Sequence, residues 1–346
     1  MNYSKPLLLL GQGARGSRYL EYAEKYQFPI LTSRLGIDLI EYDHPLYVGH
    51  PGNYGDIAAE TALKHADMVF VAGCRLSSST IGYEPKKWAR QAHKLVVDID
   101  PLELIKPGIK IDTPINTTCK EFFDKLLSVE APPVNNLKWV RQCQKWKNKY
   151  QVVTKAMRKE PNNSYVFTEA LSNAASPHDI ILVDTGSCFH VVAQAWKIKK
   201  GQRYITTGGL SSMGWWAGSL GAGVLGHTIC ITGDGSFHMN VQELATIKRN
   251  QLPIKIFVWN NGGYGLIKAT QNRFMEGRHI GVDKETGLEF PNLEKIANAY
   301  GIKYYKIGNL NIIKTVLEET QPVLCEVETQ CSTLLRPADY FIARSA

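Results

Sequence analysis

An acidic side chain and a carboxamide each follow an apolar run of the chain. Asp234 lies in the tetrapeptide Gly233–Ser236, directly after the apolar residues 228–232, and Asn261 follows the apolar residues 254–259. A helical pattern separates the two runs, which predicts two parallel strands joined by a crossover helix. Parallel strands end at the same edge of a sheet, where open α/β sheets bind ligands. The sequence therefore predicts that Asp234 and Asn261 lie close together, although they are 27 residues apart.

These residues offer the oxygen ligands that Mg²⁺ prefers. The carboxylate of Asp234, the amide oxygen of Asn261 and the backbone carbonyl of Gly263 would leave positions of an octahedral ion free for phosphate oxygens. Glycines at 233 and 235 would let the backbone approach a diphosphate closely. A Gly-Asp-Gly turn on its own is common and often only structural. The following Ser-Phe, the spacing and the paired asparagines favour a magnesium and diphosphate site.

Size and composition describe an ordinary globular protein. The 346 residues are enough for two domains, and 44% of them are hydrophobic and 21% charged. No apolar run approaches the roughly 20 residues that span a bilayer. The run Leu7–Leu10 is too short for the core of a signal peptide. We therefore expect a cytoplasmic protein without a membrane partner.

The cysteines argue against a zinc site or a disulfide framework. Their number is odd, and none forms a Cys-x-x-Cys pair, which favours reduced thiols in a cytosol. They are Cys74, Cys119, Cys143, Cys188, Cys230, Cys325 and Cys331. Cys188 lies near the predicted diphosphate site, where a reactive thiol and a packing residue are the two alternatives.

The net charge of +8 comes from 40 basic and 32 acidic residues. A basic protein can bind nucleic acid, but this chain has no nucleic-acid-binding motif. The clearest basic cluster lies in a helical segment and comprises Lys145, Lys147, Lys149, Lys155, Arg158 and Lys159. We interpret it as a solvated helix face and expect no nucleic-acid partner.

The first part of the chain alternates strand and helix patterns. Apolar runs with the length of buried strands lie at residues 6–10, 28–32, 68–72 and 94–98. This alternation predicts a parallel sheet with helices on both faces. The GxGxxG pattern Gly11–Gly16 is typical of NAD sites, which also place an acidic residue after the second strand. Here that strand leads into Thr32, Ser33 and Arg34, so NAD binding is not favoured.

The patterns divide the chain into three regions. Residues 1–128 are predicted to form a Rossmann-like domain, and residues 129–160 a linker with a charged helix. Residues 161–346 are predicted to form a second α/β domain that contains the diphosphate site. The fold class is therefore α/β, with two doubly wound parallel-sheet domains.

The order strand, Gly-Asp-Gly-Ser, helix, strand, Asn-Asn resembles the diphosphate-binding motif of thiamine diphosphate enzymes. From about residue 6 to residue 327, the chain is similar to the middle and C-terminal domains of the acetolactate synthase-like members of that family. The motifs that carry the resemblance are residues 44–46, 49–55, 66–67, 73–76, 98–101, 184–186, 208–214, 233–236, 260–263 and 322–324.

The resemblance implies a role for each matching residue. Asp234, Asn261 and Gly263 would bind Mg²⁺, the last through its carbonyl. The residues expected to contact thiamine diphosphate are Gly186, Ser211, Met213, Gly233, Gly235, Ser236 and Tyr264. Met213 would wedge the cofactor into a bent shape, and the Ser211 carbonyl would accept a hydrogen bond from its amine. Gly235 and Ser236 would hold the diphosphate through backbone and hydroxyl groups.

The activity implied by the resemblance is the ligation of carbon to carbon. Such an enzyme decarboxylates a 2-oxo acid such as pyruvate and transfers a two-carbon unit to a carbonyl acceptor. A 2-oxo acid decarboxylase of the same family and a non-catalytic, cofactor-binding subunit are the alternatives. Residues 271–288 resemble relatives that act on keto sugars, which leaves the acceptor open.

Two departures from the family pattern shape these expectations. The family's pyrimidine-binding domain supplies the catalytic glutamate and has no counterpart in this sequence. We therefore assign no catalytic residue to this chain and expect a separate pyrimidine-domain chain or a homo-oligomer as partner. In the first domain Arg75 is kept, but Ser77, Ser78 and Ser79 follow in place of the acidic residues of flavin-binding members. FAD therefore stays an open alternative.

Overall fold

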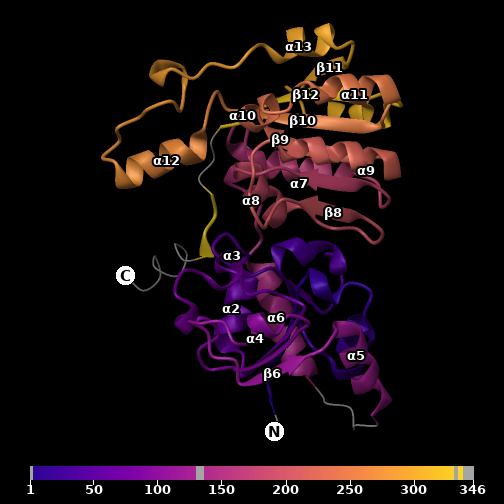
Figure 1. Ribbon diagram of the computed structural model, residues 1–346, viewed down its shortest axis with the longest axis vertical. Coiled ribbons are helices and arrows are strands. Elements are labelled where there is room, and N and C mark those ends of the chain that lie inside the picture. The colour runs from indigo at the N-terminus through magenta and orange to yellow at the C-terminus, as the bar shows by residue number, and fades with distance from the viewer. Residues whose placement is uncertain (1–2, 130–135, 331–333, 338–346) are drawn as a thin grey trace. The chain divides into compact units, whose positions relative to one another are not determined.

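The computed structural model describes residues 3–129, 136–330 and 334–337, and the chain forms two compact units (Figure 1). Of the described residues, unit 1 comprises 3–129, 136–152 and 335–337, and unit 2 comprises 153–330 and 334. Each unit is built on a six-stranded sheet in which neighbouring strands are parallel. The predicted α/β class with two parallel-sheet domains is confirmed.

The sheet of unit 1 has the order β3-β2-β1-β4-β5-β6. Its strands are β1 (Pro6–Leu10), β2 (Ile30–Thr32), β3 (Tyr47–Gly49), β4 (Met68–Ala72), β5 (His93–Asp98) and β6 (Thr113–Asn116). Every residue of β1 is buried, because apolar clusters cover both faces of the sheet. Continuous apolar runs rather than alternating ones are typical of such parallel sheets.

The helices of unit 1 connect these strands. They are α1 (Tyr19–Tyr26), α2 (Ile57–His65), α3 (Ser78–Ile81), α4 (Pro101–Leu104), α5 (Cys119–Ser128) and α6 (Leu137–Lys149). Three 3₁₀ turns accompany them: η1 (Gln12–Ala14), η2 (Arg34–Leu39) and η3 (Pro85–Lys87). The capping box Thr118–Glu121 fixes the start of α5.

Helix α6 packs on unit 1 with one side, while Lys145 and Lys149 of its basic cluster are exposed and form the solvated face that the sequence predicts. Trp139 donates from Nε1 to the Pro6 carbonyl at 2.9 Å, and Gln144 donates to the Tyr47 carbonyl at 2.9 Å. The Lys147 ammonium lies 4.2 Å from the centre of the Tyr42 ring. The buried stripe Trp139, Val140 and Cys143 attaches α6 to the core, since an apolar stripe binds a helix to a core even when its other faces are basic.

The sheet of unit 2 has the order β11-β12-β10-β9-β7-β8. Its strands are β7 (Ile180–Val183), β8 (Arg203–Thr206), β9 (Thr228–Gly233), β10 (Ile254–Asn260), β11 (Lys303–Lys306) and β12 (Val323–Glu328). The chain runs from β7 to β8 on one side and then to β9 on the other, so the strand order reverses between β7 and β9. Such a reversal opens a crevice at the carboxyl edge of the sheet.

The helices of unit 2 cover both faces of its sheet. They are α7 (Ser164–Ala174), α8 (Ser187–Ala195), α9 (Ser219–Leu225), α10 (Asp234–His238), α11 (Glu243–Asn250), α12 (Gly265–Phe274), α13 (Leu293–Ala299) and α14 (Ile312–Glu318). The 3₁₀ turns are η4 (Met157–Lys159), η5 (Trp215–Gly218) and η6 (Lys284–Thr286). In Figure 1, α8 lies beside α7, and the short α10 lies at the ends of β9 and β10. Within the described part of the chain, no helix has the length and apolar character that a membrane crossing requires.

Candidate functional site

The three predicted metal ligands lie together at the carboxyl edge of the unit 2 sheet. Strands β9 and β10 are parallel neighbours, with Val258 opposite Thr232 and Trp259 opposite Gly233. Oδ2 of Asp234 accepts hydrogen bonds from the backbone nitrogens of Asn261 and Gly263, both at 3.1 Å. The Asn261 side-chain oxygen also accepts from the Gly263 nitrogen, at 3.3 Å. The crossover between β9 and β10 therefore brings the two ends of the motif into contact.

The Asp234 carboxylate is a buried anion. It is 4% exposed, and burial raises its pKa, although hydrogen bonds from the backbone of Gly235, Asn261 and Gly263 act in the opposite direction. Among the described residues Asp234 forms no ion pair, and no three His, Cys, Asp or Glu side chains gather as a metal cluster. A buried carboxylate without a cation is costly. One carboxylate, one amide oxygen and one carbonyl fit Mg²⁺ better than a transition metal.

Gly233 leaves open space beside Asp234. Its φ of −90° is allowed for any residue, and a Cβ built on it would meet no atom within 4 Å. Neither backbone geometry nor packing therefore requires glycine at this position. At Gly186, which precedes α8, a Cβ would also meet nothing, but its φ of +88° favours glycine. The space at these two glycines is the room that a diphosphate would need.

Gly235 has a different reason to be glycine. A Cβ there would lie 2.2 Å from Cε1 of Tyr264 and 3.1 Å from Cζ of Phe290. The Tyr264 and Phe290 rings pack edge to face at 5.9 Å, and His238 stacks on Phe290 at 5.1 Å. The predicted residue Tyr264 therefore lies against the motif itself. Phe290 and His238 are neighbours of the site that the sequence patterns did not single out.

The hydroxyl of Ser236 is engaged within the protein. It donates to Oδ2 of Asp184 at 2.7 Å and accepts from the backbone nitrogen of Gly214 at 2.7 Å. The resemblance implied that this hydroxyl holds the diphosphate, and that contact stays a prediction; in the structure the hydroxyl joins β7, α10 and the segment before η5. Asp184 is the residue that the site prediction missed. It stands in the motif 184–186, but the sequence gives no sign of its hydrogen bonds.

Ser211 and Met213 lie in the segment that Ser236 and Asp184 hold. Ser211 has a φ of +55° and donates from its backbone nitrogen to the Thr207 carbonyl at 2.9 Å. Met213 is 38% exposed, which is high for a large apolar side chain. Its backbone is joined to α10 through Gly214. The structure therefore brings this segment to the same edge of the sheet as Asp234.

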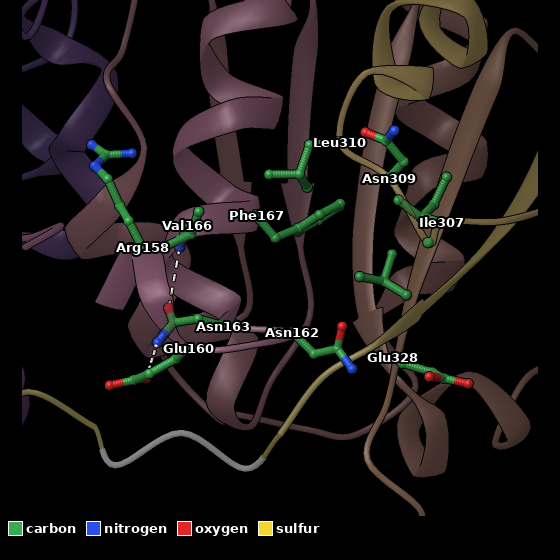
Figure 2. A pocket seen from close by; sticks show the side chains of 12 residues that line it. Arg158, Glu160, Asn162, Asn163, Val166, Phe167, Ile307, Asn309, Leu310 and Glu328 are labelled. Carbon is green, nitrogen blue, oxygen red and sulfur yellow. Dashed lines mark hydrogen bonds between the residues drawn. The ribbon is translucent and has the colours of Figure 1, made fainter. Parts of the chain in front are cut away.

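A separate hollow opens at the carboxyl ends of β11 and β12, beside the start of α7. Figure 2 shows Phe167, Ile307 and Leu310 on its apolar wall. Its charged side chains have partners in the chain, since Arg158 binds Glu169 and Lys306 binds Glu328. None of the predicted site residues lines this hollow.

The glycine-rich loop of unit 1 is packed against its neighbour. A Cβ on Gly11 would lie 2.1 Å from the carbonyl oxygen of Gly73, so these glycines allow the loops after β1 and β4 to touch. Arg34 is 7% exposed and donates to the Tyr54 carbonyl at 3.3 Å. Arg75 is exposed and pairs with Glu103 at 2.8 Å. The strand order is that of dinucleotide-binding sheets, and FAD binding stays an open alternative.

The described cysteines are all buried and free of disulfides. Cys188 is 1% exposed, and its thiol donates to the Thr185 carbonyl at 2.9 Å. Burial raises its pKa, with the nearby Asp184 adding to the effect. These properties are those of a packing residue rather than a reactive thiol. Cys331 lies outside the described residues.

Comparisons with known proteins agree with this geometry. Residues 184–327 match the family described as "Thiamine pyrophosphate enzyme, C-terminal TPP binding domain", and residues 1–126 match "Thiamine pyrophosphate enzyme, central domain". The acetolactate synthase large subunit of Lactococcus lactis is 30% identical over 338 residues, 93% of this chain and 57% of the relative.

Two further relatives come from distant organisms. The acetolactate synthase large subunit of Porphyra purpurea is 28% identical over 96% of this chain and 59% of its own length. The probable acetolactate synthase large subunit of Methanocaldococcus jannaschii is 29% identical over 93% of this chain and 57% of its own length. The chain therefore spans less than two thirds of each relative. By its two domain matches, its paired parallel sheets and its relatives, the chain belongs to the thiamine pyrophosphate enzymes, of which it carries the central and the C-terminal TPP-binding domains.

Proposed function

We propose that this chain binds thiamine diphosphate with Mg²⁺ at the carboxyl edge of unit 2 and serves a carbon–carbon ligation of the acetolactate synthase type. The reaction would decarboxylate a 2-oxo acid such as pyruvate and transfer a two-carbon unit to a carbonyl acceptor. The single observation that carries the proposal is that the backbone nitrogens of Asn261 and Gly263 both donate hydrogen bonds to the buried carboxylate of Asp234. Its place beside a reversal of strand order supports it.

The residues of this chain would bind and orient the cofactor. Asp234 and Asn261 would hold the ion through their side chains and Gly263 through its carbonyl, while the open space at Gly233 would admit the diphosphate. Met213 would support the bent cofactor from one side. The bound cofactor supplies the electron sink for decarboxylation and transfer. The ion would neutralise the diphosphate and the buried Asp234 together.

We further propose that the chain acts within an assembly. The relatives are named as large subunits, and the matched part of each is less than two thirds of its length. A pyrimidine-binding domain from another chain would supply the glutamate that the resemblance requires. The exposed side chains of Leu210, Met213 and Trp215 beside the site support such a partner.

Product analysis tests the proposed reaction. The chain would be mixed with a pyrimidine-binding domain, Mg²⁺, thiamine diphosphate and ¹³C-pyruvate, and products would be followed by NMR. A new carbon–carbon bond is expected. Acetaldehyde as the only product would instead indicate a decarboxylase, and cofactor binding without turnover would indicate a cofactor-binding subunit. The Asp234→Ala variant is the control, because any genuine turnover must disappear with it.

A further inference from the structure

Asp184 is a fully buried carboxylate at the end of β7 that joins four parts of unit 2. Its Oδ1 accepts from the backbone nitrogens of Thr185 at 2.8 Å and Trp215 at 3.1 Å. Its Oδ2 accepts from the hydroxyls of Thr232 at 2.8 Å and Ser236 at 2.7 Å. These donors come from the end of β7, from η5, from β9 and from α10. One carboxylate therefore fixes the mutual arrangement of these elements.

The hydrogen bonds of this carboxylate hold the segment 213–215 from two sides. The nitrogen of Trp215 binds Asp184 directly, and the nitrogen of Gly214 donates to the Ser236 hydroxyl at 2.7 Å. The Gly214 carbonyl in turn accepts from the Asn240 side chain at 2.8 Å. Gly214 has a φ of +85°, and a Cβ there would lie 2.7 Å from Nδ2 of Asn240. The backbone next to Met213 is therefore held by hydrogen bonds at both Gly214 and Trp215.

The chemistry of the Ser236 hydroxyl explains why it is committed to this arrangement. A hydroxyl has one hydrogen to donate, and the carboxylate of Asp184 takes it in a charge-assisted bond. This leaves the hydroxyl oxygen to accept from Gly214. In a buried site such linked bonds polarise and strengthen one another. The hydroxyl consequently has no hydrogen left for a diphosphate oxygen.

We infer that Asp184 is a positioning residue, which acts through the Ser236 hydroxyl and the Trp215 nitrogen to hold Met213 against the thiazolium part of the cofactor. The inference rests on the proposed function, because Met213 has this role only if thiamine diphosphate binds here. In this inference the Ser236 hydroxyl binds Asp184 and Gly214 and does not contact the diphosphate directly. The two roles make different predictions for ligands that contain the diphosphate alone and ligands that contain the whole cofactor.

A pair of single-hydroxyl variants tests the mechanical part of the inference. Ser236→Ala and Thr232→Val each remove one hydroxyl from Oδ2 of Asp184, but only Ser236→Ala releases Gly214. Hydrogen–deuterium exchange of the unliganded chain should become at least tenfold faster at residues 213–215 in Ser236→Ala and stay within twofold in Thr232→Val. Equal exchange in the two variants would overturn the inference.

Two titrations test the functional part. Inorganic pyrophosphate with Mg²⁺ reports on the diphosphate site, and thiamine diphosphate with Mg²⁺ reports on the whole cofactor. Ser236→Ala should bind pyrophosphate within twofold of the wild type and thiamine diphosphate at least tenfold more weakly. Thr232→Val should bind both within twofold of the wild type. If Ser236→Ala weakens both ligands equally, its hydroxyl contacts the diphosphate directly and the inference is overturned.

The exchange experiment and the titrations together separate this inference from the proposed function. A wild-type chain that binds neither ligand with Mg²⁺ would contradict the proposed function, and the role of Met213 would fall with it. The exchange experiment needs no ligand and would still decide whether Asp184 and Ser236 fix the segment. Unchanged binding of both ligands in Ser236→Ala, together with faster exchange, would show that the fixed segment does not serve the cofactor and would also overturn the inference.

Discussion

At the residue scale, two glycines of one motif are glycine for different reasons. Gly235 is required by packing, because the Tyr264 ring occupies the place of a side chain. Gly233 has ordinary backbone angles and open space around it, so the folded chain itself does not require glycine there. A glycine of the second kind is best explained by a ligand that approaches the backbone.

Replacing Gly233 with alanine should therefore separate stability from binding. Because φ is −90° and nothing lies within 4 Å, Gly233→Ala should leave stability unchanged or raise it by about 0.4–1 kcal/mol through the unfolded state. Binding of thiamine diphosphate with Mg²⁺ should fall at least tenfold, because the methyl group fills the open space. Thermal melting and calorimetric titration measure the two effects.

The matched control is Gly221→Ala in helix α9. A Cβ at Gly221 also meets nothing within 4 Å, and alanine favours a helix over glycine by about 0.5–1 kcal/mol. This variant should gain stability and keep its affinity. Normal affinity in Gly233→Ala would show that the space at Gly233 is not part of the binding site.

The buried thiols give a prediction about pH. Burial raises the pKa of Cys74 and of Cys119 to about 11. A folded-state pKa above the ordinary value of 9.0 favours the protonated thiol in the fold. The resulting stability is present below pH 9 and is lost as pH rises towards 11.

Iodoacetamide at pH 8 should label both Cys74 and Cys119 only after denaturation, as mass spectrometry of digests would show. Rapid labelling of the native chain would contradict this account of both thiols.

At the scale of elements, strand β12 supports the loop 261–263 that follows β10 and that is proposed to bind the ion. Oε1 of Glu326 accepts from the Asn260 side chain at 2.8 Å, and Oε2 accepts from the Tyr304 hydroxyl at 2.5 Å. The Asn260 side-chain oxygen accepts from the Gly262 nitrogen at 3.1 Å. The first of the paired asparagines thus orients the loop, while the second faces Asp234. The arrangement of the loop after β10 therefore depends on β12 as well as on Asp234 at the end of β9.

The variant Glu326→Ala should weaken this support. It leaves the side chains of Asn260 and Tyr304 without their acceptor, which should cost about 1–3 kcal/mol of the free energy of unfolding. Affinity for Mg²⁺ with diphosphate should fall about tenfold because the loop 261–263 is less fixed. Chemical denaturation and calorimetry measure these effects. Glu328→Ala, two residues along the same strand, removes only an exposed ion pair with Lys306. It should change the free energy of unfolding and the affinity for Mg²⁺ with diphosphate by little. Equal effects of the two variants would show that Glu326 does not orient the loop.

The sequence predicted the elements whose signals are local. The parallel pair β9 and β10, with Asp234 at the end of one and the asparagines at the end of the other, follows from two apolar runs and the helical pattern between them. The bond between Glu326 and Asn260 joins residues 66 positions apart, and that between Ser236 and Asp184 joins residues 52 apart. Such contacts depend on the strand order, which no local pattern specifies.

Strand order and helix packing also explain two other contacts that the sequence patterns did not predict. The sequence predicted a contact between the Ser236 hydroxyl and the diphosphate, but β7 enters the sheet next to β9 and brings Asp184 to that hydroxyl. The basic residues of α6 predicted a solvated face, which Lys145 and Lys149 form, but they gave no sign that three buried side chains attach the helix to unit 1. In both places the structure adds a tertiary contact that no local signal specifies.

At the scale of the whole molecule, the chain carries two parallel sheets, and the proposed ligands all belong to one of them. Unit 2 brings together every residue proposed to contact Mg²⁺ and thiamine diphosphate. Unit 1 has the strand order of dinucleotide-binding proteins, and its glycine loop is in contact with the loop after β4. Because all the proposed ligands lie in one unit, recognition of the Mg²⁺-diphosphate group should be a property of this chain. Turnover should depend on the partner domain.

Calorimetric titration of thiamine diphosphate into the chain, with and without Mg²⁺, tests this claim most directly. The wild type should bind only when Mg²⁺ is present, and Asp234→Ala should lose at least a hundredfold in affinity, because the buried carboxylate is the proposed anchor of the ion. The titration is repeated with a pyrimidine-binding domain, which should tighten binding without removing the need for Mg²⁺. Binding that is independent of Mg²⁺, or unchanged in Asp234→Ala, would contradict the account.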